Sequence, residues 1–335
     1  MIVRHRTGEY PIEFIELDEL WSALPKTSLV VTDQNLARHY PELEQTFQCK
    51  VIPAGESEKN LHRFSDVIEW LAEQGVSRGS TIIAVGGGVI GDLVGYVASS
   101  YMRGIGFIQV PTTLLAQVDS SVGGKVGVDL PQGKNLVGAF HPPSAVYVAA
   151  SFLKTLDERQ IANGMAEVWK YGFIMDASFV SDLQAARLPI EEVVHRCIQH
   201  KKFVVENDEY ERNGLRATLN YGHTVGHALE QVTDYSVYLH GEAISVGMVI
   251  EAKLGESLGI TTKGTARIVA ECLSAQGLPT TAAELSNIDA MIQAMKRDKK
   301  ASEGKLAFSL LTEIGGCKLI EDVPQSEVEL ALRNG

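Results

Sequence analysis

The first half of the chain alternates short apolar runs with helical hydrophobic patterns. At 61–75, Phe64, Val67 and Leu71 recur at helical spacing and Gly75 ends the segment, which predicts an amphipathic helix. Strands alternating with such helices predict a mostly parallel sheet with helices on its faces. Buried strands are predicted at SLVVT (28–32), CKVIPAGE (49–56), TIIAV (81–85), GFIQVP (106–111) and SAVYVA (144–149).

After about residue 150 the hydrophobic pattern becomes almost entirely helical. The segment at 304–320 could be a hairpin or a helix followed by a strand, which periodicity leaves open. We therefore predict an α/β domain at 1–150 and a mainly helical domain at 151–335. Helices are predicted around 156–174, 190–205, 222–232, 243–259 and 266–277.

Composition narrows the classes of function. A length of 335 residues favours two domains, and 45% hydrophobic with 21% charged residues is typical of a globular protein. A net charge of −12 argues against nucleic acid or an anionic membrane as partner. The apolar run at 82–98 is broken by glycines and Asp92, and the N-terminus lacks the apolar core of a signal peptide, so we predict a cytoplasmic location. Four cysteines without a C-x-x-C pair predict neither disulfides nor a thiolate zinc site.

A triple-glycine turn, IIAVGGGVIGD, separates a predicted strand from a predicted helix. Glycines let a phosphate approach the backbone, and the helix start offers free N–H groups, so a nucleotide fits there. A tight turn without a ligand would look similar. Asp33, Glu56 and Lys59 could hydrogen-bond a ribose or could be surface charges.

The glycine-rich segment 110–140 gathers hydroxyls, lysines and small residues. Together they predict an anion-binding segment, and the alternative is a polar surface loop. Its polar candidates are Thr112, Thr113, Asp119, Lys125, Lys134 and Asn135.

The stretch LNYGHTVGHALE places His223 and His227 four residues apart on one helical face, where both could reach one metal ion. His240 and Glu167 are the best additional donors. Glu167 stands among apolar residues, where an unpaired carboxylate is costly, although Lys170 could pair with it. Spacing alone leaves open which of these side chains bind the metal.

Five motifs resemble the 3-dehydroquinate synthase family of sugar-phosphate cyclases. The resemblance implies a Rossmann-like NAD-binding first domain, a helical metal- and substrate-binding second domain with zinc or cobalt, and a homodimer. The motifs are GGGVIGDLVGYVASSYMRGIGFIQVPTTLLAQVDSSVGGKVGV, GKNLVGAF, GMAEVWKYG, LNYGHTVGHALE and HGEAISVGM.

Carried over by motif, the resemblance makes Glu167, His223 and His240 the metal ligands and moves His227 to the substrate phosphate. Lys201 and Arg216 would grip a substrate carboxylate. Other implied substrate residues are Lys125, Asn135, one of Lys299 and Lys300, Arg103 from a second subunit, Lys170, Asn220 and Asp119. Implied cofactor residues are Asp33, Asn35, Glu56, Lys59, Gly87, Gly88, Asp92, Thr112, Thr113, Asp119, Lys125 and Lys134.

The implied reaction converts 3-deoxy-D-arabino-heptulosonate 7-phosphate to 3-dehydroquinate and phosphate, a step of aromatic amino acid biosynthesis in the shikimate pathway. It proceeds by transient oxidation by NAD, phosphate elimination, reduction, ring opening and aldol closure. Three alternatives are a cyclase for a carboxylate-free sugar phosphate, a polyol dehydrogenase and a non-catalytic binding module. Lys201 and Arg216 favour an acid substrate, because buried cations without a partner are costly.

Overall fold

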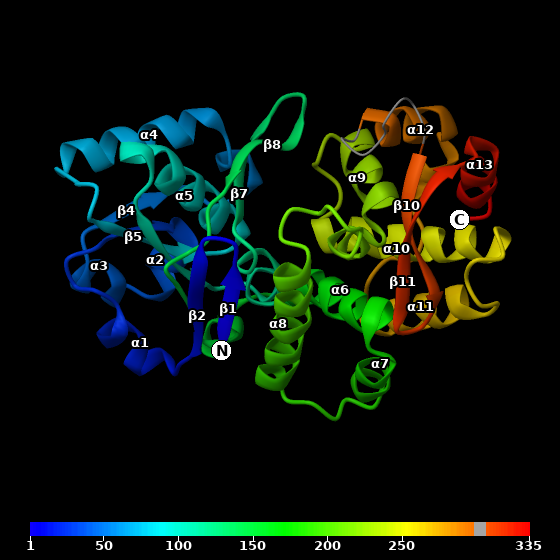
Figure 1. Ribbon diagram of the computed structural model, residues 1–335, viewed down its shortest axis with the longest axis horizontal. Helices are drawn as coiled ribbons and strands as arrows, with labels where there is room; N and C mark the ends of the chain where they lie inside the picture. Colours follow the sequence, from blue (N-terminus) through cyan, green and yellow to red (C-terminus); the bar gives the residue numbers. More distant parts are fainter. Residues whose placement is uncertain (298–305) are drawn as a thin grey trace. The chain divides into compact units, whose positions relative to one another are not determined.

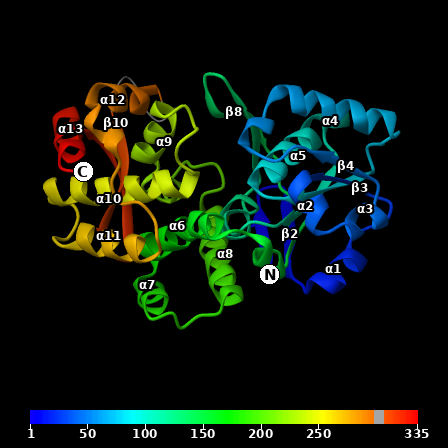
Figure 2. The same ribbon diagram turned by 180° about the vertical axis from the view of Figure 1, so that it is seen from behind.

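The computed structural model describes residues 1–297 and 306–335. These form two compact units, Met1–Asp157 and Glu158–Gly335 (Figures 1 and 2). The assignment of a cofactor domain at 1–150 and a metal and substrate domain at 151–335 stays a prediction.

The first unit is built on a seven-stranded sheet in the order β1-β2-β9-β6-β5-β3-β4. Only the β1–β2 pair is antiparallel within this sheet, so the predicted mostly parallel sheet is confirmed. The five predicted strands correspond to β3, β4, β5, β6 and β9. The bounds are β1 Ile2–His5, β2 Gly8–Phe14, β3 Leu29–Asp33, β4 Cys49–Ile52, β5 Thr81–Gly86, β6 Gly106–Pro111 and β9 Ala145–Val148.

Both faces of this sheet are buried. Successive residues of β3 point to opposite sides, with Val31 in one hydrophobic cluster and Val30 in the other. Helices α4 (Leu61–Glu73) and α5 (Gly88–Ser100) supply the first cluster. The second cluster is completed by the short helices α1 Leu17–Ala23, α2 Gln34–His39 and α3 Glu42–Thr46.

The glycine-rich segment 110–140 contains regular structure that its composition did not predict. After one π-helical turn, Ala116–Ser120, the chain forms an antiparallel hairpin of β7 (Lys125–Leu130) and β8 (Gly133–Phe140). Gly127 faces Gly138, and a Cβ on either would lie 2.6 or 2.3 Å from a carbonyl oxygen of the opposite strand. Glycine is a poor strand former, which is why the pattern suggested a loop.

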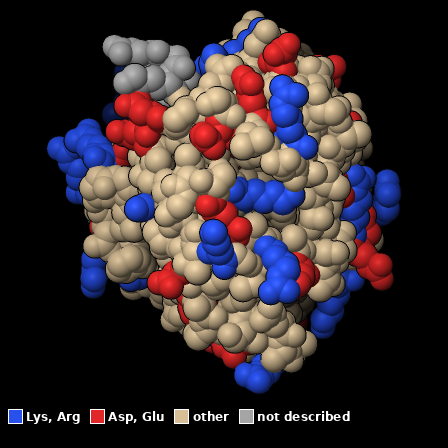
Figure 3. All heavy atoms as spheres, turned by 90° about the vertical axis from the view of Figure 1, so that its right-hand side faces the viewer, with Lys and Arg blue, Asp and Glu red and all other residues tan. Residues whose placement is uncertain are grey.

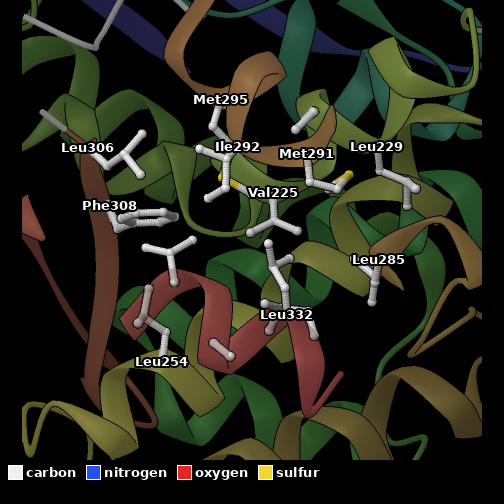
Figure 4. Close-up of a cluster of buried hydrophobic side chains, with 14 of the residues drawn as sticks. Val225, Leu229, Leu254, Leu285, Met291, Ile292, Met295, Leu306, Phe308 and Leu332 are labelled. Atoms are coloured by element: carbon white, nitrogen blue, oxygen red, sulfur yellow. The ribbon is translucent and has the colours of Figure 1, made fainter. Parts of the chain in front are cut away.

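The second unit packs helices around the hairpin of β10 and β11, so the segment left open at 304–320 contains hairpin strands. Figure 4 shows its core, where side chains from α9, α10, α12, α13 and β10 meet. The bounds are α6 Glu158–Met175, α7 Ala177–Gln184, α8 Ile190–Asn207, α9 His223–Val232, α10 His240–Ser257, α11 Thr265–Ala275, α12 Ile288–Arg297, α13 Gln325–Arg333, β10 Leu306–Glu313 and β11 Gly316–Val323.

Surface charge, helix hydropathy and the cysteines bear on the predictions made from composition. Acidic and basic side chains intermingle on the face of the second unit seen in Figure 3, where neither sign dominates. Within the described ranges, no helix combines the length and apolar character needed to cross a bilayer. Cys49, Cys197, Cys272 and Cys317 form no disulfide bonds in the structure.

Asp176 ties α7 to α8 in the second unit. Its side chain accepts hydrogen bonds from the Ser178 hydroxyl at 2.7 Å, the Phe179 N–H at 3.0 Å and Arg196 Nε at 3.0 Å, and lies 3.0 Å from His200 Nε2. Burial by itself would raise the pKa of Asp176, but these donors outweigh it and hold the pKa below its usual value. The ionised carboxylate therefore stabilises the fold.

We expect Asp176→Asn to lower the free energy of unfolding at pH 7 by about 1–3 kcal/mol, the range for a hydrogen-bonded charged group. Because the folded pKa is depressed, this stabilisation is present above the unfolded pKa of about 3.9 and is lost as the pH falls through the folded pKa. Urea unfolding at pH 7 and at pH 3 measures the difference. Glu271→Gln, in an exposed pair with Arg267, is the control and should change neither value. Equal stability of Asp176→Asn and the unchanged chain at pH 7 would contradict the expectation.

Candidate active site

Three helices of the second unit bring a carboxylate and two imidazoles together. Glu167 lies on α6, His223 is the first residue of α9, and His240 is the first residue of α10. Glu167 Oε1 is 3.4 Å from His223 Nε2 and 3.4 Å from His240 Nε2. One ligand atom from each residue lies within 4.8 Å of the others, a grouping that could hold a metal ion.

The spacing of these atoms fits a metal better than direct hydrogen bonds. At 3.4 Å both contacts exceed the usual N–H···O range. Ligands about 2.0–2.2 Å from a tetrahedral zinc ion are separated by roughly 3.3–3.5 Å, which matches. The opposite nitrogen of His223 is engaged as is usual for metal-binding histidines, since Nδ1 lies 3.1 Å from the Tyr221 carbonyl. His240 Nδ1 lies 3.6 Å from Glu230 Oε2, an electrostatic contact that is longer than a hydrogen bond.

The electrostatics of this group also suit a cation. Glu167 is 1% exposed, and burial would raise its pKa, but Lys170 and the two imidazoles hold the pKa well below its usual range. Burial lowers the pKa of His223 to about 4. Burial alone would also lower the pKa of His240, yet Glu230 and Glu167 raise it to about 9. The carboxylates thus favour a positive charge at His240, which a proton or a metal ion supplies.

Glycines allow α9 and α10 to approach backbone to backbone. A Cβ on Gly247 would lie 1.9 Å from the Gly222 carbonyl oxygen, and one on Gly226 would lie 2.9 Å from Ile244 Cα. Gly222 also adopts φ +83°, which favours glycine, immediately before α9 begins. The glycines that flank the histidines in GHTVGHALE therefore determine how closely the two helices meet.

His227 belongs to a second grouping with Glu230 and His240, whose ligand atoms also lie within 4.8 Å of one another. The ring centroids of His223 and His227 are 5.2 Å apart, so the helical spacing does place them on one face. Sequence reasoning missed Glu230. Its position, three residues after His227 and seven after His223, is a signal that helical spacing could have used.

The predicted carboxylate-binding side chains are buried in the second unit. Lys201 on α8 is 7% exposed, and Arg216, at the start of a short 3₁₀ helix that ends at Asn220, is 2% exposed. Arg216 donates from its guanidinium to the Glu209 carbonyl. Asn220 Nδ2 donates to the Ala217 carbonyl at 2.9 Å. Lys170 forms an ion pair with Glu167, as its spacing suggested.

The triple-glycine turn lies where the sequence predicts, between β5 and α5 of the first unit. Gly87 is the N-cap of α5, and a Cβ there would meet Thr113 Cγ2 at 3.0 Å, while a Cβ on Gly88 would meet Ser120 Oγ at 3.2 Å. The N–H of Thr112 donates to the Gly86 carbonyl at 3.0 Å. Bare backbone N–H groups at this helix start are suited to phosphate.

Charged candidates of the first unit form linked pairs. Lys59 is 5% exposed and lies 2.6 Å from Asp92, and burial by itself would lower its pKa, but Asp92 and Glu56 raise it. Lys134 Nζ lies 3.7 Å from Glu56 Oε1. These pairs bring the turn at 55–59, α5 and the β7–β8 hairpin together.

The remaining candidates of the first unit lie at helix ends, in turns and in the β7–β8 hairpin. Asp33 Oδ1 caps α2 by accepting the N–H of Asn35 at 2.8 Å. Lys125 is exposed at the start of β7, and Asp119 lies in the π-helical turn. Two candidates have left-handed backbone, Asn135 with φ 53° and Arg103 with φ 66°. Lys299 and Lys300 lie outside the described residues.

Comparison with known proteins gives consistent results across the chain. The family described as 3-dehydroquinate synthase N-terminal matches residues 49–163, and the one described as 3-dehydroquinate synthase C-terminal matches residues 164–301. A curated 3-dehydroquinate synthase of Desulforamulus reducens is 44% identical over 321 residues, which cover 91% of this chain and 89% of that protein.

Two solved structures resemble the whole chain. The 2-epi-5-epi-valiolone synthase of Streptomyces hygroscopicus subsp. jinggangensis 5008, solved with NAD+ and Zn2+, has a TM-score of 0.89 and 27% identity, covering 100% of this chain and 98% of that one. A 2-deoxy-scyllo-inosose synthase, solved with carbaglucose-6-phosphate, NAD+ and Co2+, has a TM-score of 0.86 and 26% identity, covering 100% and 99%.

Proposed function

This chain belongs to the 3-dehydroquinate synthase family, and we propose that it converts 3-deoxy-D-arabino-heptulosonate 7-phosphate to 3-dehydroquinate and phosphate. It is an NAD- and metal-dependent carbon–oxygen lyase. The observation that carries the proposal is the group of Glu167, His223 and His240, whose atoms are spaced as ligands of one ion. Two related solved structures carry NAD+ with Zn2+ or Co2+.

We propose that Glu167, His223 and His240 hold the divalent metal. When bound there, a metal ion supplies Lewis-acid stabilisation of a deprotonated substrate hydroxyl. The carboxylate adds negative charge, the Tyr221 carbonyl orients the His223 ring through Nδ1, and the charge of Glu230 lies 3.6 Å from His240 Nδ1. Lys170 and Asn220 bind and orient the substrate hydroxyls in this proposal.

When bound, NAD would supply a hydride acceptor. Its pyrophosphate is proposed to lie on the N–H groups of Gly87 and Gly88, where α5 begins. Lys59 keeps Asp92 in place through their buried ion pair. The other proposed cofactor residues are Asp33, Asn35, Glu56, Thr112, Thr113, Asp119, Lys125 and Lys134.

We propose that the substrate phosphate is bound by side chains that can donate hydrogen bonds. Lys125, Asn135 and His227 take this role, with Arg103 supplied by a second copy of the chain, so the functional form is proposed to be a homodimer. Domain roles, with the cofactor on 1–150 and the metal and substrate on 151–335, belong to the same proposal, as does a cytoplasmic location.

Acid specificity separates this function from cyclases of carboxylate-free sugar phosphates. Lys201 and Arg216 are buried cations of the second unit, and the family resemblance places them at a substrate carboxylate, which such cations bind through charge-assisted hydrogen bonds. The heptulosonate phosphate carries a carboxylate and glucose 6-phosphate does not. We therefore expect phosphate release from the first and none from the second, measured with NAD and Zn2+ present. Turnover of glucose 6-phosphate alone would overturn the assignment.

Lys201→Met tests the carboxylate contact directly. Losing a charge-assisted hydrogen bond worth about 1.5–3 kcal/mol should lower kcat/KM for the heptulosonate phosphate roughly 10–100-fold. Lys202→Met is the matched control, because Lys202 is the next residue of α8 and pairs with Glu206 at 2.7 Å. If both variants retain the kcat/KM of the unchanged chain, Lys201 does not bind the carboxylate.

A further inference from the structure

Two buried polar side chains hold the N-termini of the helices that begin with His223 and His240. Asn163, on α6 and 6% exposed, accepts the N–H of Gly241 on Oδ1 at 2.6 Å. Glu251, on α10 and 0% exposed, accepts two N–H groups of the first turn of α9. Neither residue is a metal ligand.

The contacts of Glu251 enclose His223. Its Oε2 accepts the N–H of Gly222 at 2.7 Å, and its Oε1 accepts the N–H of Val225 at 3.2 Å. These donors lie just before and two residues after His223, and N–H groups at a helix start have no partner within the helix. A buried carboxylate at this helix end is also favoured by the helix dipole. Glu251 therefore fixes the backbone from which the His223 ring projects.

The carbonyl that orients the His223 ring is anchored to the same part of α10. Tyr221, whose carbonyl contacts His223 Nδ1, donates its hydroxyl proton to the Met248 carbonyl at 2.6 Å. The backbone around His223 is thus attached to α10 both before and after the ring.

Asn163 acts in the same way on the start of α10. Gly241 follows His240 directly, and a Cβ on Gly241 would lie 2.0 Å from the Asn163 carbonyl oxygen, so α6 and α10 are in close contact there. Glu167 lies one helical turn beyond Asn163 on α6. The helix that carries the carboxylate thus caps α10, and α10 in turn caps α9.

We infer that Asn163 and Glu251 are positioning residues of the metal centre, which set the places of the His240 and His223 nitrogens relative to Glu167. The inference rests on the proposed role of these three residues as metal ligands. Residues that orient metal ligands typically contribute about 10–100-fold to metal affinity. Because Asn163 and Glu251 act through the backbone of the helices that carry the ligands, replacing either residue should weaken metal binding without removing a ligand.

Glu256 provides a matched control on the same helix. Its Oε1 accepts the N–H of Ala266 at 2.7 Å and so caps α11, which carries none of the proposed ligands. Glu251→Gln keeps the side-chain shape but leaves one of the two N–H groups without its acceptor. Glu256→Gln removes the same charge from the same helix, but the one remaining amide oxygen can still accept the Ala266 N–H. An effect of losing a carboxylate charge from α10 would be shared by both variants.

The test measures Zn2+ affinity by competition with a chelator, and the visible absorption of bound Co2+, at a temperature where circular dichroism shows each variant folded. We expect Glu251→Gln to bind Zn2+ about 10–100-fold more weakly than the unchanged chain, with altered Co2+ bands. Glu256→Gln should match the unchanged chain. Equal affinities of Glu251→Gln and Glu256→Gln would overturn the role of Glu251.

Asn163 supplies a second pair of variants, which decides the matter if Glu251→Gln does not fold. Asn163→Ala removes the acceptor for the Gly241 N–H and should lower the affinity for Zn2+ at least 10-fold. Asn163→Asp keeps an acceptor oxygen at this position and should retain the affinity of the unchanged chain. Unchanged affinity in Asn163→Ala would overturn the inference. Failure of the metal site itself is distinguishable, because Glu167→Gln would then bind Zn2+ as tightly as the unchanged chain.

Discussion

Glu167→Gln is expected to lower turnover by roughly three orders of magnitude and to leave the purified protein without stoichiometric metal. A metal ion contributes several kcal/mol of transition-state stabilisation, and each 1.36 kcal/mol is tenfold in rate. Glutamine has the shape of glutamate but lacks its charge, so the two imidazoles would lose the anionic partner whose oxygen lies 3.4 Å from each of them. Metal content and phosphate release should therefore fall together.

The neighbouring ion pair on α8 supplies the control for this substitution. Glu206 pairs with Lys202 one helical turn away, much as Glu167 pairs with Lys170, but it lies outside the proposed ligand set. Glu206→Gln should keep full metal content and turnover. If Glu167→Gln retains its metal and its rate, the proposed ligand set is wrong.

Lys125→Ala is expected to lower kcat/KM about 100-fold while leaving the melting temperature unchanged. Removing one preorganised donor to a reacting anionic group costs about 100- to 1,000-fold. Lys125 is exposed at the start of β7, after Gly123 and Gly124 with φ of 104° and 65°, so the fold does not depend on burying its side chain. Exposure thus separates a loss of catalysis from a loss of stability.

Phosphate release with the heptulosonate phosphate and thermal unfolding measure the two effects. Lys154→Ala, an exposed lysine outside the glycine-rich segment, should affect neither. Unchanged kinetics in Lys125→Ala would exclude Lys125 from the phosphate site. A lowered melting temperature would mean instead that the lysine supports the hairpin.

Local hydrophobic patterns predicted most of the helices and strands. The helix at 61–75 and the strand at 81–85 have compact apolar signals, and α4 and β5 occupy those positions. The β7–β8 hairpin was not predicted, because its strands pair at two facing glycines, Gly127 and Gly138. These glycines allow the two backbones to approach closely, but glycine has a low strand propensity and so does not indicate a strand in the sequence. The β1–β2 pair was likewise not predicted from the sequence.

The candidate site shows the same limit. Helical spacing placed His223 and His227 on one face, but the partners of His223 come from α6 and α10, which spacing within α9 cannot reach. Sequence reasoning named Glu167 and His240 as the best additional donors, and the family resemblance then predicted them as ligands in place of His227. Asn163 and Glu251 act on the backbone of distant helices, so only the folded chain reveals them.

A single reaction tests whether NAD acts catalytically and whether phosphate release requires the metal. The chain, Zn2+, the heptulosonate phosphate and NAD at far below the substrate concentration are combined, while released phosphate and the NADH absorbance are followed together. We expect many phosphates released per NAD, no accumulation of NADH, and loss of phosphate release when a chelator removes the metal. NADH formed mole for mole with product, or phosphate release that persists without metal, would contradict this expectation.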